Sequence, residues 1–344
     1  MPRIFSFAAP LVLLVSFLLM LRRVEPFYTN FYSIAWWCYI LWLASRNELR
    51  AARSRFQFPS LFRQPRQYFA LILLSAAVWF FFELYNARLH NWAYVGMPLQ
   101  RWIRWPGYFL AYGTVLPGIF ETARWLEGRF DGESAVNGHQ ESPERDARWN
   151  PALGKLVSLF GLGCMILPLL VPRFFFPLVW GGLIFLLDPL VESIGQRNLV
   201  LNLFVGDRSR PLLLLGSGLI CGFFWELWNF WAGAKWVYTL PYFQFWRIFE
   251  MPALGFLGFP PFALECWLLF VFVRYFWEKH GRAGRLVTII GIAAICAVGI
   301  YVVDHFVVKE YVTRTCGDKV VPIQRSRLAL PPGSASRWVM SDAP

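Results

Sequence analysis

Charged residues are scarce in this sequence: only 16% of its 344 residues are Asp, Glu, Lys or Arg. A soluble globular protein carries about 25% charged residues, so the composition excludes an ordinary soluble domain. Hydrophobic residues make up 57% of the chain and aromatic residues 19%. The net charge of +12 comes mainly from arginines in short loops between apolar segments. This pattern is typical of the cytoplasmic loops of membrane proteins, and it argues against nucleic acid as a partner.

Cysteine and cofactor motifs are also lacking. The six cysteines are dispersed, with no Cys-x-x-Cys pair and no Cys/His cluster, which excludes a disulfide framework and a zinc site. Neither GxGxxG, a P-loop, HExxH nor GxSxG occurs at a usable position, so we expect no cofactor and no metal. The four histidines stand near segment ends or in a loop, which argues against a haem-binding bundle.

Long apolar segments, by contrast, recur along the chain. Each is long enough to cross a hydrocarbon core of about 30 Å, and together they predict an all-α integral membrane protein with about nine transmembrane helices. The first segment lacks a small-x-small cleavage site and is followed by Arg22 and Arg23, so we expect a retained helix rather than a signal peptide. The segments are 4–21, 28–44, 69–89, 104–125, 154–171, 174–192, 211–233, 253–277 and 286–304.

Arginine-rich loops predict the orientation. The loop 45–68 is the richest in arginine and should be cytoplasmic, as should the loops 126–153, 193–210 and 278–285. The loops 90–103 and 234–252 should then lie outside. The stretch 127–153 is polar, as expected of a cytoplasmic linker, and the composition of 313–344 predicts a disordered tail.

One set of residues occurs twice in the same order. FFFELYN, with Glu83 and Asn86, matches FFWELWN, with Glu226 and Asn229, roughly 144 residues later. Trp-Ala-Tyr (92–94) then matches Trp-Val-Tyr (236–238), and LPGIFE (116–121) matches PPFALE (260–265). Because the copies are four helices apart, both have the same orientation. We therefore expect two parallel four-helix repeats, 1–126 and 154–277, and a last transmembrane helix within 278–312.

Carboxylates at membrane depth indicate where a site lies. An ionisable group inside a bilayer costs at least about 2.5 kcal/mol and is a functional hypothesis by default. The second unit is the more acidic and is the expected working half, with Glu226, Glu265 and Asp188 as candidate catalytic residues. Candidate substrate-binding residues are Asn229, Trp225, Trp236, Tyr238, Arg247, Glu83, Asn86 and Glu121.

A structural role is the alternative for these residues. The carboxylates and amides would then pair with Arg247 or cap loop amides. Trp92, Tyr94, Trp236 and Tyr238 would be interfacial belt residues.

Two motifs carry resemblances to known families. WELWN (225–229) and FEMPALGFLGFPPFALE (249–265) resemble a family of uncharacterised bacterial polytopic membrane proteins marked by WEFWN and FEMPxLGxxGFxPFALE. The order Trp225-Glu226, Trp236-Val-Tyr238, Pro252, Glu265 is similar to that of lycopene cyclase-domain carotenoid cyclases and hydratases. Their adjacent Pro-x-Glu-Glu pair is absent here. The second resemblance implies chemistry on an isoprenoid or carotenoid.

Three classes of function stay open. The first is acid catalysis on an isoprenoid or other apolar lipid, since a carboxyl among aromatic rings can supply a proton in a dry pocket. The second is a transporter or permease of a small solute between the two units. The third is a non-catalytic subunit or assembly factor with membrane protein partners. In each case the lipid bilayer is a partner, and we expect the bacterial inner (plasma) membrane as the location.

Overall fold

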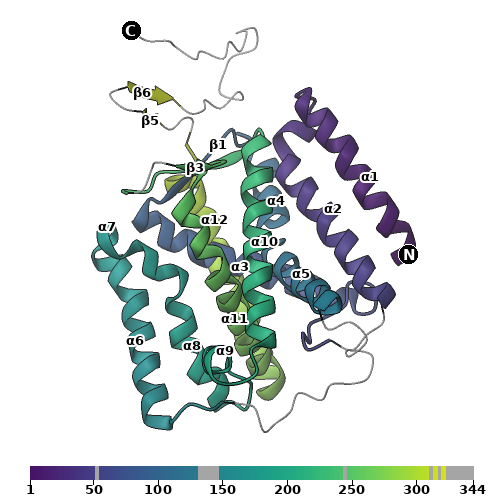
Figure 1. Cartoon of the computed structure of the whole chain (residues 1–344). Coiled ribbons are helices and arrows are strands. Elements are labelled where there is room, and N and C mark those ends of the chain that lie inside the picture. The colour runs from purple at the N-terminus through teal and green to yellow at the C-terminus, as the bar shows by residue number, and fades with distance from the viewer. Residues whose placement is uncertain (51–53, 131–146, 243–245, 310–312, 317–318, 323–344) are drawn as a thin grey trace.

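The computed structural model describes residues 1–50, 54–130, 147–242, 246–309, 313–316 and 319–322. This part of the chain forms an α-helical bundle with three short antiparallel strand pairs (Figure 1). The first half contains α1 (Pro2–Leu21), α2 (Phe27–Arg50), α3 (Pro65–Leu89), β1 (Trp92–Val95), α4 (Arg101–Tyr112) and α5 (Val115–Phe130). The second half contains α6 (Pro151–Leu170), α7 (Pro172–Phe175), η3 (Phe176–Trp180), α8 (Gly182–Ser193), α9 (Val200–Phe204), α10 (Ser209–Trp231), β2 (Lys235–Tyr238), β3 (Arg247–Ile248), β4 (Met251–Pro252), η4 (Ala253–Gly258), α11 (Phe259–Lys279), α12 (Gly281–Val302), the π-helical turn η5 (Val303–Val307), β5 (Thr313–Cys316) and β6 (Lys319–Pro322).

Six of the described helical segments are long and apolar enough to cross a membrane. A seventh span results if Pro172–Trp180 and Gly182–Ser193, which are bent by 40°, count as one. In α1 and in the last span only 17% of the apolar stretch is buried inside the protein. Apolar surface of this extent indicates contact with lipid, so the chain is an α-helical membrane protein. The six segments are Pro2–Leu21, Pro65–Leu89, Pro151–Leu170, Ser209–Trp231, Ala253–Lys279 and Gly281–Val307.

Two of the nine expected spans are missing even when the bent pair is counted as a seventh span. The segment 28–44 is helical as part of α2, but tyrosines and Asn30 lower its hydropathy. The segment 104–125 is divided into α4 and α5 at Gly113. A Cβ atom on Gly113 would lie 2.5 Å from the Phe109 carbonyl oxygen and 2.7 Å from Ile72, so this close approach to α3 requires glycine. The nine crossings therefore stay a prediction.

The expected linker and tail are only partly described. Helix α5 continues to Phe130, past the expected boundary at residue 126, and the rest of the linker up to residue 146 lies outside the described residues. In the expected disordered tail, β5 and β6 form an antiparallel pair. Residues 323–344 lie outside the described part.

Strands β1 and β2 form a two-stranded antiparallel pair that joins the two halves, and we call it the central ribbon. Trp92 lies opposite Tyr238, and Tyr94 lies opposite Trp236. The pairing continues where the amide of Thr239 donates to the carbonyl oxygen of Asn91 at 2.8 Å. Since β1 follows α3 and β2 follows α10, the ribbon places the carboxyl ends of these two helices side by side.

The opposite ends of α3 and α10 meet the arginine-rich loop. Arg210, near the start of α10, donates to the carbonyl oxygen of Arg55 at 3.1 Å. Arg274, near the end of α11, donates to that of Gln57 at 2.6 Å. Helix α3 has 25 residues, a rise of about 37 Å. The loop 45–68 and the central ribbon therefore lie at opposite ends of the bundle, as the sequence predicts.

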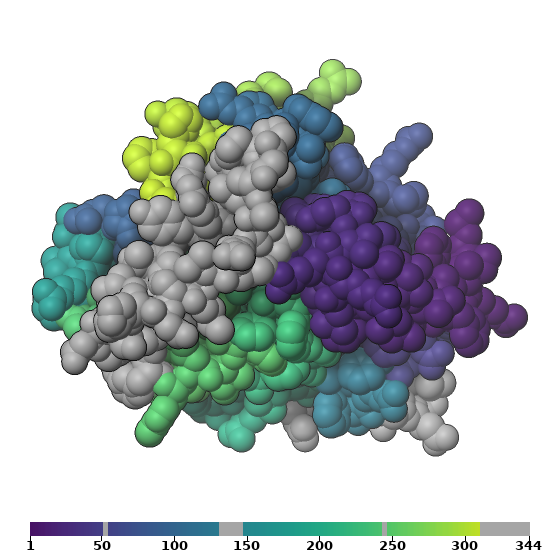
Figure 2. Space-filling view, turned by 90° about the horizontal axis from the view of Figure 1, so that it is seen from above, coloured from purple at the N-terminus to yellow at the C-terminus, as the bar shows by residue number. Residues whose placement is uncertain are grey.

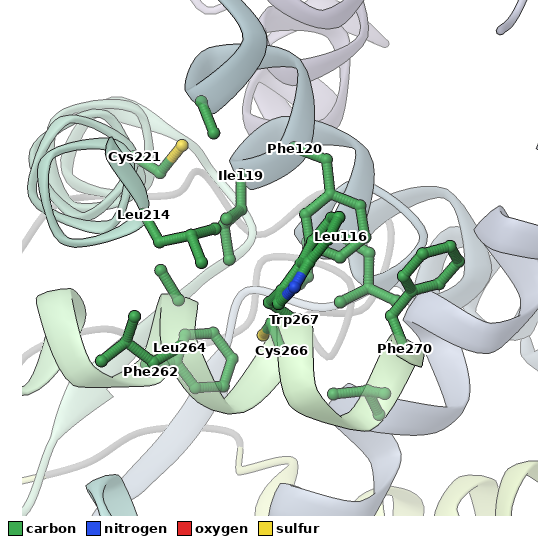
Figure 3. Packing of buried hydrophobic residues seen from close by; sticks show 14 of the residues in the cluster. Leu116, Ile119, Phe120, Leu214, Cys221, Phe262, Leu264, Cys266, Trp267 and Phe270 are labelled. Atoms are coloured by element: carbon green, nitrogen blue, oxygen red, sulfur yellow. The ribbon is translucent and has the colours of Figure 1, made fainter. Parts of the chain in front are cut away.

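Between these ends the interior is packed with apolar side chains from α5, α10 and α11. Figure 3 shows Leu116, Ile119 and Phe120 facing residues of α11. The Phe120 ring lies 5.2 Å from the Trp267 ring and 5.2 Å from the Phe270 ring, measured between centroids. Helices α1 and α2, purple in Figure 2, form one flank of the molecule.

Candidate functional site

Glu83 is a fully buried carboxylate at the carboxyl end of α3. One of its oxygens, Oε1, accepts hydrogen bonds from Trp79 Nε1 at 2.9 Å, Trp92 Nε1 at 3.1 Å and Tyr94 Oη at 2.5 Å. Trp79 is one helical turn before Glu83 and lies on the same face. Trp92 and Tyr94 alternate along β1 and therefore point to the same side of the ribbon. The local folding of α3 and β1 thus brings three donors to one carboxylate oxygen.

Asn86 fixes the turn that makes this possible. Its Oδ1 accepts from the backbone amides of Asn91 and Trp92 at 2.9 and 3.2 Å, and its Nδ2 donates to the Trp92 carbonyl oxygen at 2.9 Å. His90, between the helix and the strand, has a φ of 53° and lies in the left-handed region. The Asn86 side chain therefore pairs with backbone amides and a carbonyl group that follow the end of α3, where the helix itself offers them no partner.

Glu226 has the equivalent position in the second half and is also fully buried. Its Oε1 accepts from Tyr238 Oη at 2.7 Å, and Tyr238 Oη in turn accepts from Trp236 Nε1 at 3.0 Å. Asn229 repeats the turn, with bonds of 2.9 Å to the amide and to the carbonyl oxygen of Trp236. Among the described residues, Glu226 Oε2 has no hydrogen-bond partner.

The tyrosines of the ribbon are donors to these carboxylates. Burial raises the pKa of Tyr94 and that of Tyr238, and the adjacent Glu83 and Glu226 raise them further. Both phenols therefore carry their protons at neutral pH and can donate to the carboxylates.

Two cavities lie beside the central ribbon, and residues of both halves line them. The larger, which we call the lateral cavity, has a volume of about 410 Å³. Phe176 and Trp180 of η3, Leu254 and Leu257 of η4, and Trp92 of the ribbon line it. Leu254 and Leu257 are 53% and 71% exposed, so this wall of the cavity lies at the molecular surface, at the start of the apolar span Ala253–Lys279.

The smaller, which we call the inner cavity, has a volume of about 90 Å³ and lies against α2 and α4. Tyr112 of α4 and Trp225 of α10 contribute to its wall, and their Oη and Nε1 atoms are buried without a hydrogen-bond partner among the described residues. The two cavities share one set of lining residues: Trp79, Trp225, Trp236, Tyr238 and Phe259. Tyr238 therefore borders both cavities and binds Glu226 behind them.

Three sequence candidates lie apart from this cluster. Glu265 on α11 accepts from the amide of Leu183 at 3.1 Å, at the start of α8. Asp188 accepts from Trp149 Nε1 at 3.0 Å and from the amide of Leu199 at 2.5 Å, which fixes the loops around α8. Glu121 on α5 accepts from Asn47 Nδ2 at 2.8 Å.

Arg247 is the candidate on β3, where it donates to the Glu250 carbonyl oxygen at 2.8 Å. The structure thus brings together Glu226, Asn229, Trp236 and Tyr238, with Glu83 and Asn86 in the equivalent cluster, and Trp225 lines both cavities. It gives Glu265, Asp188, Glu121 and Arg247 partners elsewhere.

Trp79 and Asp304 are polar partners that sequence reasoning missed. Trp79 stands four residues before Glu83, a spacing that would have placed it on the same helix face. Asp304 lies in η5 and accepts from Arg104 Nε at 2.9 Å and from Tyr108 Oη at 2.8 Å. Asp304 thus links the last span to α4 beside the inner cavity. No short sequence motif predicts this long-range contact.

No family model, no curated protein and no solved structure matches the chain. Among the described residues, no three His, Cys, Asp or Glu side chains are placed to hold a metal ion.

Proposed function

We propose that the protein binds an apolar lipid, such as an isoprenoid, in the lateral cavity and that Glu226 acts there as an acid through Tyr238. The observation that carries this proposal is an aromatic cavity of about 410 Å³ that has exposed leucines of an apolar span in its wall and is bordered by the hydroxyl that binds Glu226. A cavity of this size, mostly apolar with few polar groups, is typical of a small-molecule site. A wall at the surface of an apolar span suits a ligand that arrives from the bilayer.

The proposed reaction is a proton transfer to a carbon–carbon double bond. In the reactive state Glu226 is protonated and donates to Tyr238 Oη, which frees the Tyr238 proton from its bond to Glu226. Tyr238 Oη then delivers its proton to one alkene carbon and receives the proton of Glu226. The electrons of the π bond form the new C–H bond and leave a carbocation on the neighbouring carbon. Trp180, Trp225 and Trp236 offer ring faces that stabilise a cation without trapping it. Loss of a proton from an adjacent carbon to the same pair forms a new double bond and completes an isomerisation. In a cyclisation, a second double bond of the ligand attacks the cation and forms the ring bond before that proton is lost.

The two other classes of function receive less support from the described contacts. Transport of a small solute requires a polar route between the two ends, whereas α5, α10 and α11 pack apolar side chains there. If the protein were a non-catalytic subunit whose carboxylates pair with helices of a partner protein, those carboxylates would have to lie on its surface. Glu83 and Glu226 are instead fully buried and bound by residues of their own chain.

We also infer that the chain is a duplication whose two units share one orientation, with a total of nine crossings. The support is the register of the central ribbon. The repeat matches Trp92 with Trp236 and Tyr94 with Tyr238, so replacing each residue by its match converts the Trp92–Tyr238 pair into the Trp236–Tyr94 pair, which is also present. This is the relation produced by a twofold axis perpendicular to the ribbon, which suits parallel repeats. The units differ where α4 of the first corresponds to β3, β4 and η4 of the second. That difference encloses the lateral cavity.

Lipid and pigment profiling of a deletion strain tests the proposed function. We expect an apolar lipid to accumulate in the deletion strain and to return to its normal level with the wild-type gene. Glu226→Gln should insert normally and fail to restore that level. Asp188→Asn, which alters a buried carboxylate far from the ribbon, is the matched control and should restore it if the variant folds. An unchanged lipid profile in the deletion strain would overturn the proposal.

A further inference from the structure

A third cavity, of about 450 Å³, lies at the end of the bundle opposite the central ribbon. We call it the arginine cavity because Arg63, Arg124 and Arg274 line it from the loop 45–68, from α5 and from α11. Most of its other lining residues are polar, in contrast to the two ribbon cavities. The remaining lining residues are Asn47, Glu48, Ser54, Phe56, Gln57, Phe58, Pro59, Ser60, Gln64, Gln67 and Glu278.

Each arginine of this cavity has a carboxylate nearby, but the pairs differ in closeness. Arg63 forms a close ion pair with Glu48, whereas Arg274 lies 3.9 Å from Glu278. Arg124 lies 3.9 Å from Glu121, which is behind the wall, and its guanidinium lies 3.7 Å from the centre of the Phe58 ring. Arg124 and Arg274 are therefore held only by long ion pairs.

Two polar atoms of the wall are buried and unpaired. Arg124 donates through Nη2 to the carbonyl oxygens of Phe56 and Phe58, but its Nε has no hydrogen-bond partner among the described residues. Asn47 Oδ1 likewise lacks a donor there, while Asn47 Nδ2 binds Glu121, and the Asn47 residue is 9% exposed. A buried donor without an acceptor is costly, so the wall is incomplete without a ligand that supplies an acceptor to Arg124 and a hydroxyl to Asn47.

We propose that the arginine cavity binds a phosphate ester. Arginine forks match the geometry of phosphate oxygens, and such charge-assisted hydrogen bonds are stronger than neutral ones. A phosphate ester with a hydroxyl group also satisfies Asn47 Oδ1. The ester is the headgroup of a phospholipid or a soluble compound of the same chemistry. Phe69 and Trp277 are 59% and 37% exposed and adjoin the cavity segments in sequence, so acyl chains of a phospholipid would have an apolar surface to follow.

Native mass spectrometry of the full chain in detergent tests this proposal with phosphatidylglycerol as the probe. The wild-type protein should retain phosphatidylglycerol and should not retain diacylglycerol, which lacks the phosphate. The double variant R63Q/R274Q should weaken retention by at least about tenfold, because two charge-assisted contacts are lost. R208Q/R282Q, which also removes two positive charges, outside the cavity at the same end of the bundle, should leave retention unchanged. R124Q is a second variant that should also weaken retention of phosphatidylglycerol. Its result is interpreted only if its thermal unfolding matches that of the wild type.

Competition then identifies the source of the phosphate. Displacement of phosphatidylglycerol by glycerol 3-phosphate at millimolar concentration would assign the cavity to soluble esters. Retention in its presence would assign the cavity to the lipid headgroup. Equal retention of phosphatidylglycerol by R63Q/R274Q and R208Q/R282Q would overturn the proposal. Equal retention of diacylglycerol and phosphatidylglycerol by the wild type would also overturn it. This result is independent of what the lateral cavity binds.

Discussion

Glu83 and Glu226 have the same place in their units but different surroundings. Three donors share one oxygen of Glu83, whereas Glu226 has one donor on Oε1 and a second oxygen without a partner. A carboxylate bound by three donors is a structural centre, because losing it leaves several buried donors unpaired. Glu226 is instead linked to the lateral cavity through the hydroxyl of Tyr238. The same sequence motif therefore stands in two different surroundings, which the motif alone cannot distinguish.

Amide substitutions should separate the two roles by their effect on stability. Glu83→Gln replaces a charged acceptor of three bonds and should lower the free energy of unfolding by about 1–3 kcal/mol. Glu226→Gln keeps an acceptor for Tyr238 and breaks no hydrogen bond among the described residues, but it buries one amide without an acceptor. It should therefore lower the free energy of unfolding by about 1 kcal/mol, less than Glu83→Gln. Thermal unfolding of both variants in one detergent gives the comparison. A greater loss in Glu226→Gln than in Glu83→Gln would contradict the assignment.

The tyrosines provide a second matched pair. Tyr238→Phe removes the only hydroxyl among the described residues that links Glu226 to the lateral cavity. It should therefore abolish complementation of the deletion strain while the protein still inserts. Tyr94→Phe removes one of three donors to Glu83 and should cost about 1 kcal/mol of stability with complementation retained. Complementation by Tyr238→Phe at the wild-type level would argue against the proton path.

At the scale of elements, long apolar segments were easy to predict and their interruptions were not. Helices α1, α3, α6, α10 and α12 follow from uninterrupted apolar sequence. At the break between α4 and α5, Gly113 lies close to Ile72 of α3, and such a tertiary contact leaves no local signal in the sequence. The same holds for the ribbon. Each Trp-x-Tyr element is visible in the sequence, but only the fold shows that the two strands pair and that their tyrosines face inward.

The contact between α6 and α8 rests on a small residue and can be tested directly. A Cβ atom on Gly161 would lie 2.2 Å from the amide nitrogen of Leu186, whereas one on Gly163 would meet nothing within 4 Å. Gly161→Ala should push α8 away and lower the free energy of unfolding by about 1–3 kcal/mol. Gly163→Ala should be neutral or raise it by up to about 1 kcal/mol, because alanine favours helix. Equal stability of the two variants would show that α6 and α8 do not approach in this way.

For the whole molecule, the sequence predicts an α-helical membrane protein with one arginine-rich end, and both features agree with the structure. The candidate site was predicted in part. Glu226, Asn229, Trp236 and Tyr238 form one cluster, because a repeated motif reports residues that a repeated local structure holds together. Asp188 was grouped with them because it is acidic and deep, and Glu265 because it belongs to another repeated motif, PPFALE (260–265). Their partners come from neighbouring helices, which the sequence does not identify.

Orientation is a prediction at this scale. Single cysteines at Leu99, near the ribbon, and at Glu278, at the arginine-rich end, are both on exposed residues. In a cysteine-free background, a membrane-impermeant maleimide applied to intact cells should label the first and not the second, since arginine-rich loops stay in the cytoplasm. Labelling at both positions in intact cells, with membrane integrity verified, would contradict the proposed nine crossings.

Photolabelling of the lateral cavity tests the central claim most directly. An isoprenoid alcohol that carries a diazirine should be added to the protein in lipid nanodiscs, and its adducts mapped by peptide mass spectrometry. The account predicts adducts on η3 and η4, at residues such as Trp180, Leu254 and Leu257, and competition by the unmodified isoprenoid. Leu257→Trp, which enlarges a side chain of the cavity wall, should reduce these adducts. Adducts confined to the lipid-facing surfaces of α1 and α12, without competition, would show that the cavity does not bind such a lipid.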